Sequence, residues 1–395
     1  MDCPPTKESG RTRSINVKEL ALLFAKLGAT AFGGPAAHIA MMEEEVVKRR
    51  QWLSHERFLD LLGATNLIPG PNSTEMALHI GYLRGGWRGL IVAGACFIVP
   101  AVLLTLLFAH LYVLFGTVPA LQPFVAGIRP AIVAVIAAAV VRLGRPMVKK
   151  RFPATMGVIV VILSLIGVNE ILLLFCAGFL GLLWAFRDRI SRVLTGLAAV
   201  VPFLADGILR VNPSVQLPAT ASVVGLGLFF LKIGSILYGS GYVLVAFLQG
   251  GLVDTNHWLT QTQLFDAIAV GQFTPGPVLS TATFIGYVIL GVPGAAVATT
   301  AIFLPSFLFV LLTNPFLPRL RNSRRLSGFL DGVNAASLGL MISVTITLGL
   351  ASLTGVGPIA IFVIAAVVVI GWKVNAGWVV LGSAILGAVL HALHI

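Results

Sequence analysis

The chain has 395 residues, of which 57% are hydrophobic and only 11% are charged. An ordinary soluble domain carries about 25% charged residues, and the mean hydropathy here is +0.96. The composition therefore excludes a disordered chain, argues against a soluble globular protein, and predicts an all-α polytopic membrane protein. The net charge is +12, from 27 basic and 15 acidic residues. The basic residues lie in short clusters between apolar runs, and they form no basic–aromatic stripe. This distribution favours membrane loops over nucleic-acid binding.

The chain opens with a polar, basic tail over residues 1–18, and no short apolar core with a cleavage site follows it. We therefore expect a cytoplasmic tail and not a signal peptide. Residues 17–47 are apolar but interrupted at Gly33-Gly34-Pro35, and residues 56–84 are interrupted at Pro69-Gly70-Pro71. Each half of the second segment has about 11–13 residues, at most ~20 Å as helix, which is too short to cross a bilayer comfortably. This segment is predicted to be a re-entrant hairpin with Pro-Gly-Pro at its tip.

Apolar stretches that can span a membrane follow in the order 89–113, 121–143, 152–168 and 170–186. The same order then recurs, with segments 222–253 and 262–288 interrupted at Gly239-Ser240-Gly241 and Pro275-Gly276-Pro277. The later spans are expected at 294–314, 327–349, 357–372 and 376–392.

An internal repeat explains this recurrence. At an offset of 206 residues Phe24, Gly33 and Asp60 meet Phe230, Gly239 and Asp266, and the two Pro-Gly-Pro motifs coincide. After one deletion the offset becomes 205, and Ile-Gly-Tyr at 80–82 meets Ile-Gly-Tyr at 285–287. A nearly fixed offset over about a hundred residues indicates duplication.

Loop charges give the relative orientation of the two copies. The basic loops at 48–50, 84–88 and 142–151 have equivalents at 254–256, 289–293 and 347–356 that contain no Lys or Arg, whereas uncharged 114–120 corresponds to basic 319–325. Because positive residues mark the cytoplasmic side, we predict two inverted-topology repeats with broken or re-entrant helices, as in secondary transporters. The predicted divisions are the tail 1–18, a first repeat 19–190, a linker 191–221 that crosses the membrane once, and a second repeat 222–395.

Two broken hairpins of opposite orientation bring their tips together near the membrane midplane. Helix N-termini there attract anions, and hydroxyls and amides add donors. The alternative is that Pro-Gly-Pro merely kinks a helix. The expected substrate-binding residues are Lys26, Gly33, Gly34, Asn66, Pro69, Gly70, Pro71, Asn72, Ser73, Thr74, Lys232, Gly239, Gln272, Thr274, Pro275, Gly276, Pro277 and Ser280.

Lys26 and Lys232 are a matched pair inside apolar segments. A lysine within the membrane costs ~3 kcal/mol or more and usually serves a purpose, so we expect both to face one cavity and balance a divalent anion. The alternative is snorkelling to the interface.

Glu75 follows the first tip, and its partner in the second copy is Thr281. This asymmetry suggests a proton-coupling or gating role for Glu75, with His38 and His79 as further titratable groups. Local pairing of Glu75 with His79 on one helix is the alternative.

Several kinds of chemistry find no support in the sequence. It has no P-loop, no metalloprotease spacing, and no catalytic arrangement of Ser, Cys and His. We therefore expect no enzyme, no cofactor, no metal and no catalytic residue.

The motifs FAKLGATAFGGP, QWLSHERFLDLLGATNLIPGPNST and IGYLRGGWRG resemble the chromate ion transporter family, and FLKIGSILYGSGYV, FDAIAVGQFTPGP and IGYVILGVPGA are similar to the same domain again. The chain is thus similar to the long, two-domain form of that family. The resemblance implies export of chromate from the cytoplasm, driven by the proton motive force and conferring chromate resistance, with sulfate related as a tetrahedral dianion. The second copy departs from the first at two places: it has Ser240-Gly241 where the first has Gly34-Pro35, and Thr281 where the first has Glu75. These differences put an equal role for both copies in doubt.

From the residues alone the substrate is an anion, and chromate, sulfate, phosphate or an organic acid all fit. The expected partners are chromate or alternatively sulfate, protons and the lipid bilayer, with a homodimer as an option and no nucleic acid. The expected location is the bacterial cytoplasmic (inner) membrane, with a multi-pass chain and a cytoplasmic N-terminus. A passive anion channel and a membrane-embedded enzyme or scaffold are the other classes considered.

Overall fold

The computed structural model describes residues 17–115, 122–186, 221–238, 241–314, 324–372 and 374–392. Within these residues every regular element is a helix and none is a strand, as the composition predicts. Most of the predicted linker 191–221 and its expected membrane crossing lie outside the described residues, as do the greater part of the tail and Gly239.

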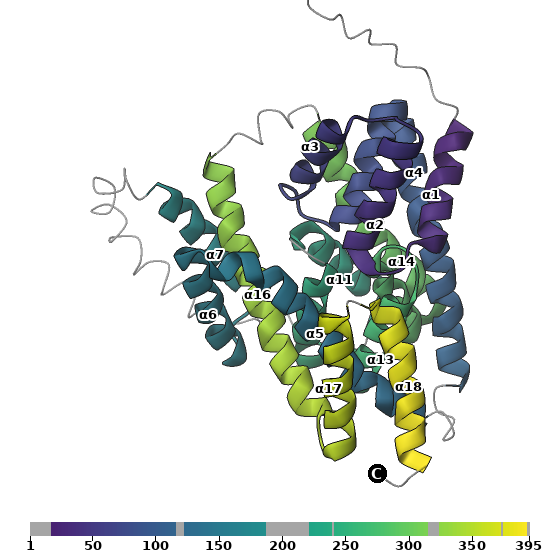
Figure 1. The fold of residues 1–395 in the computed structure, drawn as a ribbon, viewed down its shortest axis with the longest axis vertical. Helices are drawn as coiled ribbons and strands as arrows, with labels where there is room; N and C mark the ends of the chain where they lie inside the picture. The colour runs from purple at the N-terminus through teal and green to yellow at the C-terminus, as the bar shows by residue number, and fades with distance from the viewer. Residues whose placement is uncertain are drawn as a thin grey trace, which may run out of the picture.

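The first half begins with four short elements and continues with four longer helices (Figure 1). They are α1 Val17–Thr30, α2 Gly34–Glu43, the π-helical turn η1 Glu44–Arg49, α3 His55–Thr65, α4 Asn72–Phe115, α5 Gln122–Val148, α6 Arg151–Leu165 and α7 Glu170–Ala185. The break between α1 and α2, the hairpin of α3 and α4, and the later spans all fall where the sequence places them.

The second half repeats this order, with two additional short 3-10 helices. It consists of α11 Val223–Ile236, η3 Gly241–Val243, α12 Leu244–Leu248, the π-helical turn η4 Gln249–Thr255, α13 Gln261–Phe273, η5 Val278–Ser280, α14 Thr281–Thr313, α16 Arg324–Ser352, α17 Val356–Gly371 and α18 Ala376–Ala392. Even the π-helical turns occur at matched positions, so the duplication extends to backbone irregularities.

Local sequence explains where these helices begin. Ser54 accepts a hydrogen bond from the backbone at the start of α3, and Thr260 does the same for α13, where Gln263 completes a capping box. Such caps satisfy the free N–H groups of a helix start. Gly33 precedes α2 with a φ of 111°, which is a left-handed conformation that glycine adopts without strain.

Each hairpin runs directly into a long span through a matched turn. In α4 the helix is interrupted at Gly85 and Gly86 (φ 60°), and in α14 it is interrupted at Leu290 and Gly291 (φ 63°). The returning arm of each hairpin therefore ends at this turn, and the long span begins directly after it.

Within each half, glycines bring a matched pair of helices into close backbone contact. A Cβ on Gly28 of α1 would strike the carbonyl of Phe97 in α4, and a Cβ on Gly234 of α11 would strike the carbonyl of Ile302 in α14. Small residues of this kind are typical of packed membrane helices. The fold is thus an all-α structure of two inverted repeats.

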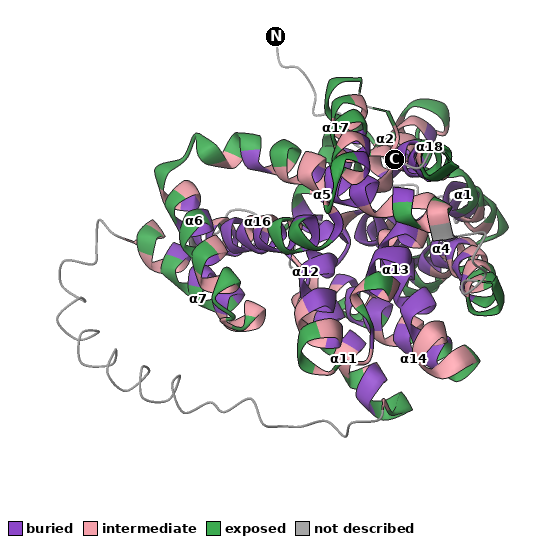
Figure 2. Ribbon diagram, turned by 90° about the horizontal axis from the view of Figure 1, so that it is seen from below, coloured by how far each residue is buried: buried purple, intermediate pink, exposed green. Residues whose placement is uncertain are grey.

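Burial follows the expected distribution for a membrane protein. Figure 2 shows buried residues gathered at the centre, on α12 and α13, and exposed residues on the outward faces. The exposed side chains include many large apolar ones, such as Val356, Val363 and Trp372, which suit contact with lipid. In the described residues four helices are long and apolar enough to cross a membrane, over Asn72–Phe115, Pro123–Val148, Val278–Thr313 and Leu326–Ser352. The chain is a multi-pass membrane protein.

Candidate anion site

The two Pro-Gly-Pro tips contact the opposite repeat through a reciprocal pair of hydrogen bonds. The amide of Gly70 donates to the carbonyl of Leu237, which follows α11, at 2.6 Å. The amide of Gly276 donates to the carbonyl of Ala31, which follows α1, at 3.0 Å. Ala31 and Leu237 are equivalent at the repeat offset of 206. The structure therefore brings both tips to the junction between the repeats, as inverted broken hairpins require.

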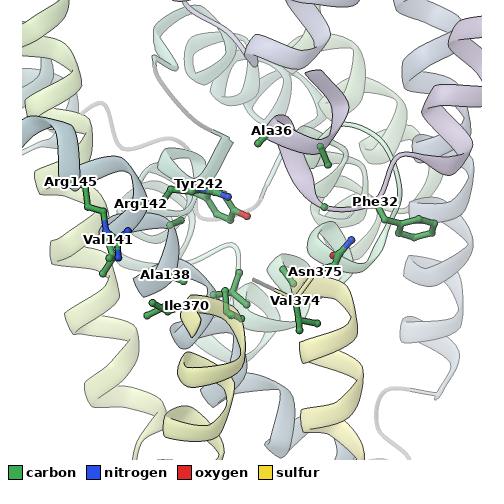
Figure 3. Close-up of a pocket in the computed structure, with 16 residues that line it drawn as sticks. Phe32, Ala36, Ala138, Val141, Arg142, Arg145, Tyr242, Ile370, Val374 and Asn375 are labelled. Carbon is green, nitrogen blue, oxygen red and sulfur yellow. The ribbon is translucent and has the colours of Figure 1, made fainter. Parts of the chain in front are cut away.

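A cavity of about 410 Å³ lies beside this junction (Figure 3). Its wall combines the break between α1 and α2, the second half of α5, Tyr242 of η3 and the connection between α17 and α18. The polar side chains in this wall are Arg142, Arg145, Tyr242 and Asn375. Segments from both repeats thus form one cavity.

The charge of the cavity is positive. Arg142 and Arg145 both line it, and none of the described lining residues is acidic. The first turn of α2 also lines it through Ala36 and Ala37, and the residue before α2, Gly33, offers no capping side chain. Pro35 in this turn has no N–H group. The N–H groups of Gly34 and Ala36 are the donors that such a helix start leaves available, and the positive end of the helix dipole favours an anion. Two arginines add charge-assisted donors.

Tyr242 connects this cavity to the second tip. Its hydroxyl lies beside the first turn of α2, where a Cβ added to Gly34 would be 3.6 Å away. The same hydroxyl donates to Oε1 of Gln272 at 3.5 Å and is hydrogen-bonded to Arg142. Gln272 is in the last turn of α13, directly before the second Pro-Gly-Pro. The side chains of Gln272 and Tyr242 therefore connect the second tip to Arg142.

A family model for chromate transporters matches residues 18–182 and again residues 224–388. The chain belongs to the chromate transporter family. It is 30% identical over 404 residues to the chromate transport protein of Cupriavidus metallidurans, covering 99% of this chain and 98% of that protein. It is 32% identical over 340 residues to the chromate transport protein of Pseudomonas aeruginosa, covering 85% and 81%. It is also 30% identical over 380 residues to the probable chromate transport protein of Synechococcus elongatus, covering 92% and 91%. No solved structure matches the chain.

In this member of the chromate transporter family, Glu75 lies against the first tip. Its side chain is 0% exposed, and within the described residues neither carboxyl oxygen has a hydrogen-bond partner. A Cβ added to Gly70 would meet the Glu75 carboxyl and the hydroxyl of Ser306, which is also buried and unpartnered in the described residues. The Tyr238 side chain lies near Glu75. Local pairing of Glu75 with His79 is not seen.

The two candidate histidines occupy different surroundings. His38 is buried, and its Nε2 is 2.9 Å from the same Ala31 carbonyl that binds the second tip. His79 is buried beside the amide of Asn314. The second repeat has Leu244 and Phe284 at the equivalent positions, so neither histidine has a titratable equivalent there.

The matched lysines point to separate acidic partners. Nζ of Lys26 is 3.0 Å from Oε1 of Glu45, and the Lys26 side chain is 57% exposed. Lys232 is exposed and close enough to act electrostatically on Glu170 at the start of α7. The Glu170 carboxyl occupies the space where Gly250 of η4 lacks a side chain. Neither lysine lines the cavity between the repeats, and their predicted binding of the anion stays a prediction.

The other predicted residues surround the tips. Asn66 and Asn72 are hydrogen-bonded to each other at 2.9 Å and line a neighbouring cavity. Ser73 is buried, and the buried hydroxyls of Thr74 and Ser280 lack a hydrogen-bond partner within the described residues. The Thr274 hydroxyl donates to a carbonyl of its own helix at 2.7 Å. Gly239 lies outside the described residues.

Sequence reasoning missed the arginines of the cavity. Arg142 and Arg145 belong to a basic cluster that the positive-inside bias explains equally well. Their spacing of three residues, which puts them on one helix face, is the signal that could have singled them out. Asn375 and Tyr242 carry no comparable signal, because their contribution depends on how distant segments meet.

Proposed function

We propose that this protein is a secondary active transporter that exports chromate, CrO₄²⁻, across the bacterial cytoplasmic membrane, driven by the proton motive force. Membership of the chromate transporter family and the names of its relatives support chromate as the substrate. These relatives are named as transport proteins, which agrees with the expectation that the chain is not an enzyme. The N-terminus lies in the cytoplasm in this proposal, because the basic loops mark that side.

The arginine-lined cavity is the observation that carries this proposal. A tetrahedral dianion needs positive charge and several hydrogen-bond donors, and Arg142, Arg145, Tyr242 and the start of α2 supply both around one space. The Gly70 and Gly276 amides are engaged by carbonyls of the opposite repeat. The geometry thus favours an anion in the cavity next to the tips over one directly between them.

Glu75 is the group that we assign to proton coupling. A buried ionised carboxylate without partners is very costly, so the closed site holds a neutral carboxyl. Glu75 contacts the Gly70 backbone, so opening of the first tip is the step that lets this group exchange a proton. His38 and His79 are the further titratable groups of the same repeat.

Transport in everted membrane vesicles tests the proposal. Labelled chromate should accumulate when the vesicle interior is acidified, and a protonophore should abolish accumulation. Substitutions Arg142→Gln and Arg145→Gln should each lower the rate at limiting chromate about tenfold or more, because a charged hydrogen bond contributes about 1.5–3 kcal/mol. Arg151→Gln, in the same basic cluster but outside the cavity lining, should transport normally.

Three results would contradict the proposal in different ways. Flux that ignores the pH gradient would indicate a passive anion channel, and no flux in proteoliposomes would indicate an enzyme or scaffold. Sulfate that competes with chromate at equal concentration would make sulfate or a related oxyanion the physiological substrate. Normal chromate transport rates in Arg142→Gln and Arg145→Gln would show that the anion does not pass through this cavity.

A further inference from the structure

A second cavity, of about 320 Å³, lies next to the arginine-lined one. Adjacent residues of two elements line the two spaces. Arg142 and Tyr242 line the first cavity, whereas Leu143 and Val243 line the second. Arg142 of α5 and Tyr242 of η3 are hydrogen-bonded to each other, so the contact between these two elements lies between the two spaces.

The second cavity is lined by uncharged polar groups at its inner end. Asn66 and Asn72 lie at the first tip, where α4 begins and presents its helix N-terminus. Asn334 and Ser337 of α16 line the same space, and Ser337 is 3% exposed. Its hydroxyl has no hydrogen-bond partner within the described residues. A buried hydroxyl without a partner is uncommon, and here it lines a space that a polar ligand can enter.

The charged groups in the wall of this cavity are Lys150 and Asp331. Nζ of Lys150 is 3.5 Å from Oδ1 of Asp331, and the two side chains are 64% and 45% exposed. Strong charge-assisted hydrogen bonds are shorter, at about 2.7–2.9 Å, so this pair is loose and easily exchanged. Lys150 follows Lys149 and precedes Arg151, and a basic loop of this kind marks the cytoplasmic side.

We propose that this second cavity is a cytoplasmic entry subsite for the transported oxyanion, in which Lys150 exchanges Asp331 for the arriving dianion. The proposal rests on the proposed function, since the ligand is the transported substrate. Asp331 repels the anion until the Lys150 ammonium leaves Asp331 and binds the anion. The Asn side-chain amides, the Ser337 hydroxyl and the N-terminus of α4 supply hydrogen-bond donors to the anion within the cavity. From this subsite the anion reaches Arg142 by passing the contact between α5 and η3.

Two single substitutions should move the Michaelis constant in opposite directions. In everted vesicles, where the cytoplasmic face is outside, Lys150→Gln should raise KM for chromate about threefold to tenfold, because one unit charge near a dianion is lost. Asp331→Asn should lower KM by about the same factor, because the repelling charge is gone and Lys150 is free. The double variant Lys150→Gln/Asp331→Asn, which restores the net charge, should return KM to near the original value.

Controls separate this electrostatic effect from a structural one. Lys149→Gln removes an adjacent exposed charge that does not line the cavity, and it should leave KM unchanged. Higher ionic strength should shrink the KM differences of both single variants, since salt screens exposed charges. The maximal rate of chromate transport should be the same in these four variants as in the unaltered protein.

The outcomes that overturn the entry subsite are distinct from failure of the proposed function. If the unaltered protein transports chromate but both single variants change KM in the same direction, the pair is merely structural. An equal KM shift in Lys149→Gln would show that the effect comes from general surface charge. An unchanged KM in both Lys150→Gln and Asp331→Asn would show that the anion does not bind at this subsite. An unaltered protein that transports no chromate would instead refute the proposed function.

Discussion

The amide of Gly276 donates to the carbonyl of Ala31 at 3.0 Å, so the tip of the second repeat is held by the first helix of the other repeat. The matched bond from Gly70 to Leu237, at 2.6 Å, holds the first tip in the same way. Any movement of one repeat against the other must strain or break these bonds. The two tips therefore join the repeats to each other.

Substitution of the tip glycine should stop transport. Gly276 has a φ of 91°, and a Cβ there would be 2.9 Å from Cβ of Ala101 and 3.0 Å from the carbonyl oxygen of Gly28. Gly276→Ala therefore combines a left-handed backbone, which costs about 1–2 kcal/mol in any other residue, with a steric clash. We expect loss of chromate transport in vesicles, with the protein still present in the membrane.

Gly291→Ala is the matched control for this substitution. Gly291 has a φ of 63°, but nothing lies within 4 Å of an added Cβ. This variant carries the backbone strain without the clash, and it should retain most of the transport rate. Equal losses in both variants would show that strain alone matters and that tip contact is irrelevant.

Removal of the Tyr242 hydroxyl should weaken binding without blocking transport. The hydroxyl joins Arg142 to Gln272, and a hydrogen bond of this kind contributes about 0.5–1.5 kcal/mol net. Tyr242→Phe should raise KM for chromate about threefold to tenfold. Tyr82→Phe, in a separate apolar cluster, is the control. A normal KM in Tyr242→Phe would mean that the hydroxyl does not orient the arginine.

The repeated architecture could be predicted from the sequence because it depends on local rules. Hydropathy gave the spans, the two Pro-Gly-Pro motifs gave the hairpin tips, and the loop charges indicated the inversion. Each of these properties is visible within a short segment or at a fixed offset. The loop predicted at 84–88 is the Gly85-Gly86 turn, which joins the hairpin arm to the next span. Its exact backbone was not predictable, since two glycines between apolar runs are also compatible with a longer, open loop.

The composition of the site could be predicted only in part. Its glycines and tip residues were proposed from their recurrence, and Glu75 from its asymmetry, and their roles stay predictions. The arginines were not, because a basic residue near a loop has the same sequence context whether it faces water or a cavity. The partner of Lys26 was also unpredictable, since the pairing with Glu45 depends on how η1 folds back over α1.

The ion pair between Lys26 and Glu45 should stabilise the protein in a pH-dependent way. Its hydrogen bond from Lys26 lowers the pKa of Glu45 below the ordinary value of 4.5. A depressed carboxyl pKa gives stability that is present above the ordinary pKa and lost as the pH falls through the lower folded value. A double-mutant cycle with Lys26→Gln and Glu45→Gln should give a coupling of about 0.2–1 kcal/mol at neutral pH.

Thermal unfolding of the purified protein in detergent measures this coupling. It should stay constant from pH 8 to about pH 5 and fade only at lower pH. A coupling of zero at pH 7 would contradict the role of the pair. In the same proteins, a raised KM for chromate in Lys26→Gln would show that Lys26 also contacts the anion, as its position in an apolar segment predicts.

Replacement of Glu75 by glutamine should uncouple transport from the proton gradient. Glutamine keeps the shape of the side chain but cannot carry a proton on and off, so an imposed pH gradient should no longer drive chromate accumulation in everted vesicles. Glu44→Gln removes an exposed carboxylate paired with Lys48 and should preserve the response. Because the second repeat has Thr281 in place of Glu75, no equivalent group in that repeat can substitute for the lost carboxyl. A gradient response in Glu75→Gln equal to that of the unaltered protein would therefore move the coupling group to His38, His79 or elsewhere in the chain.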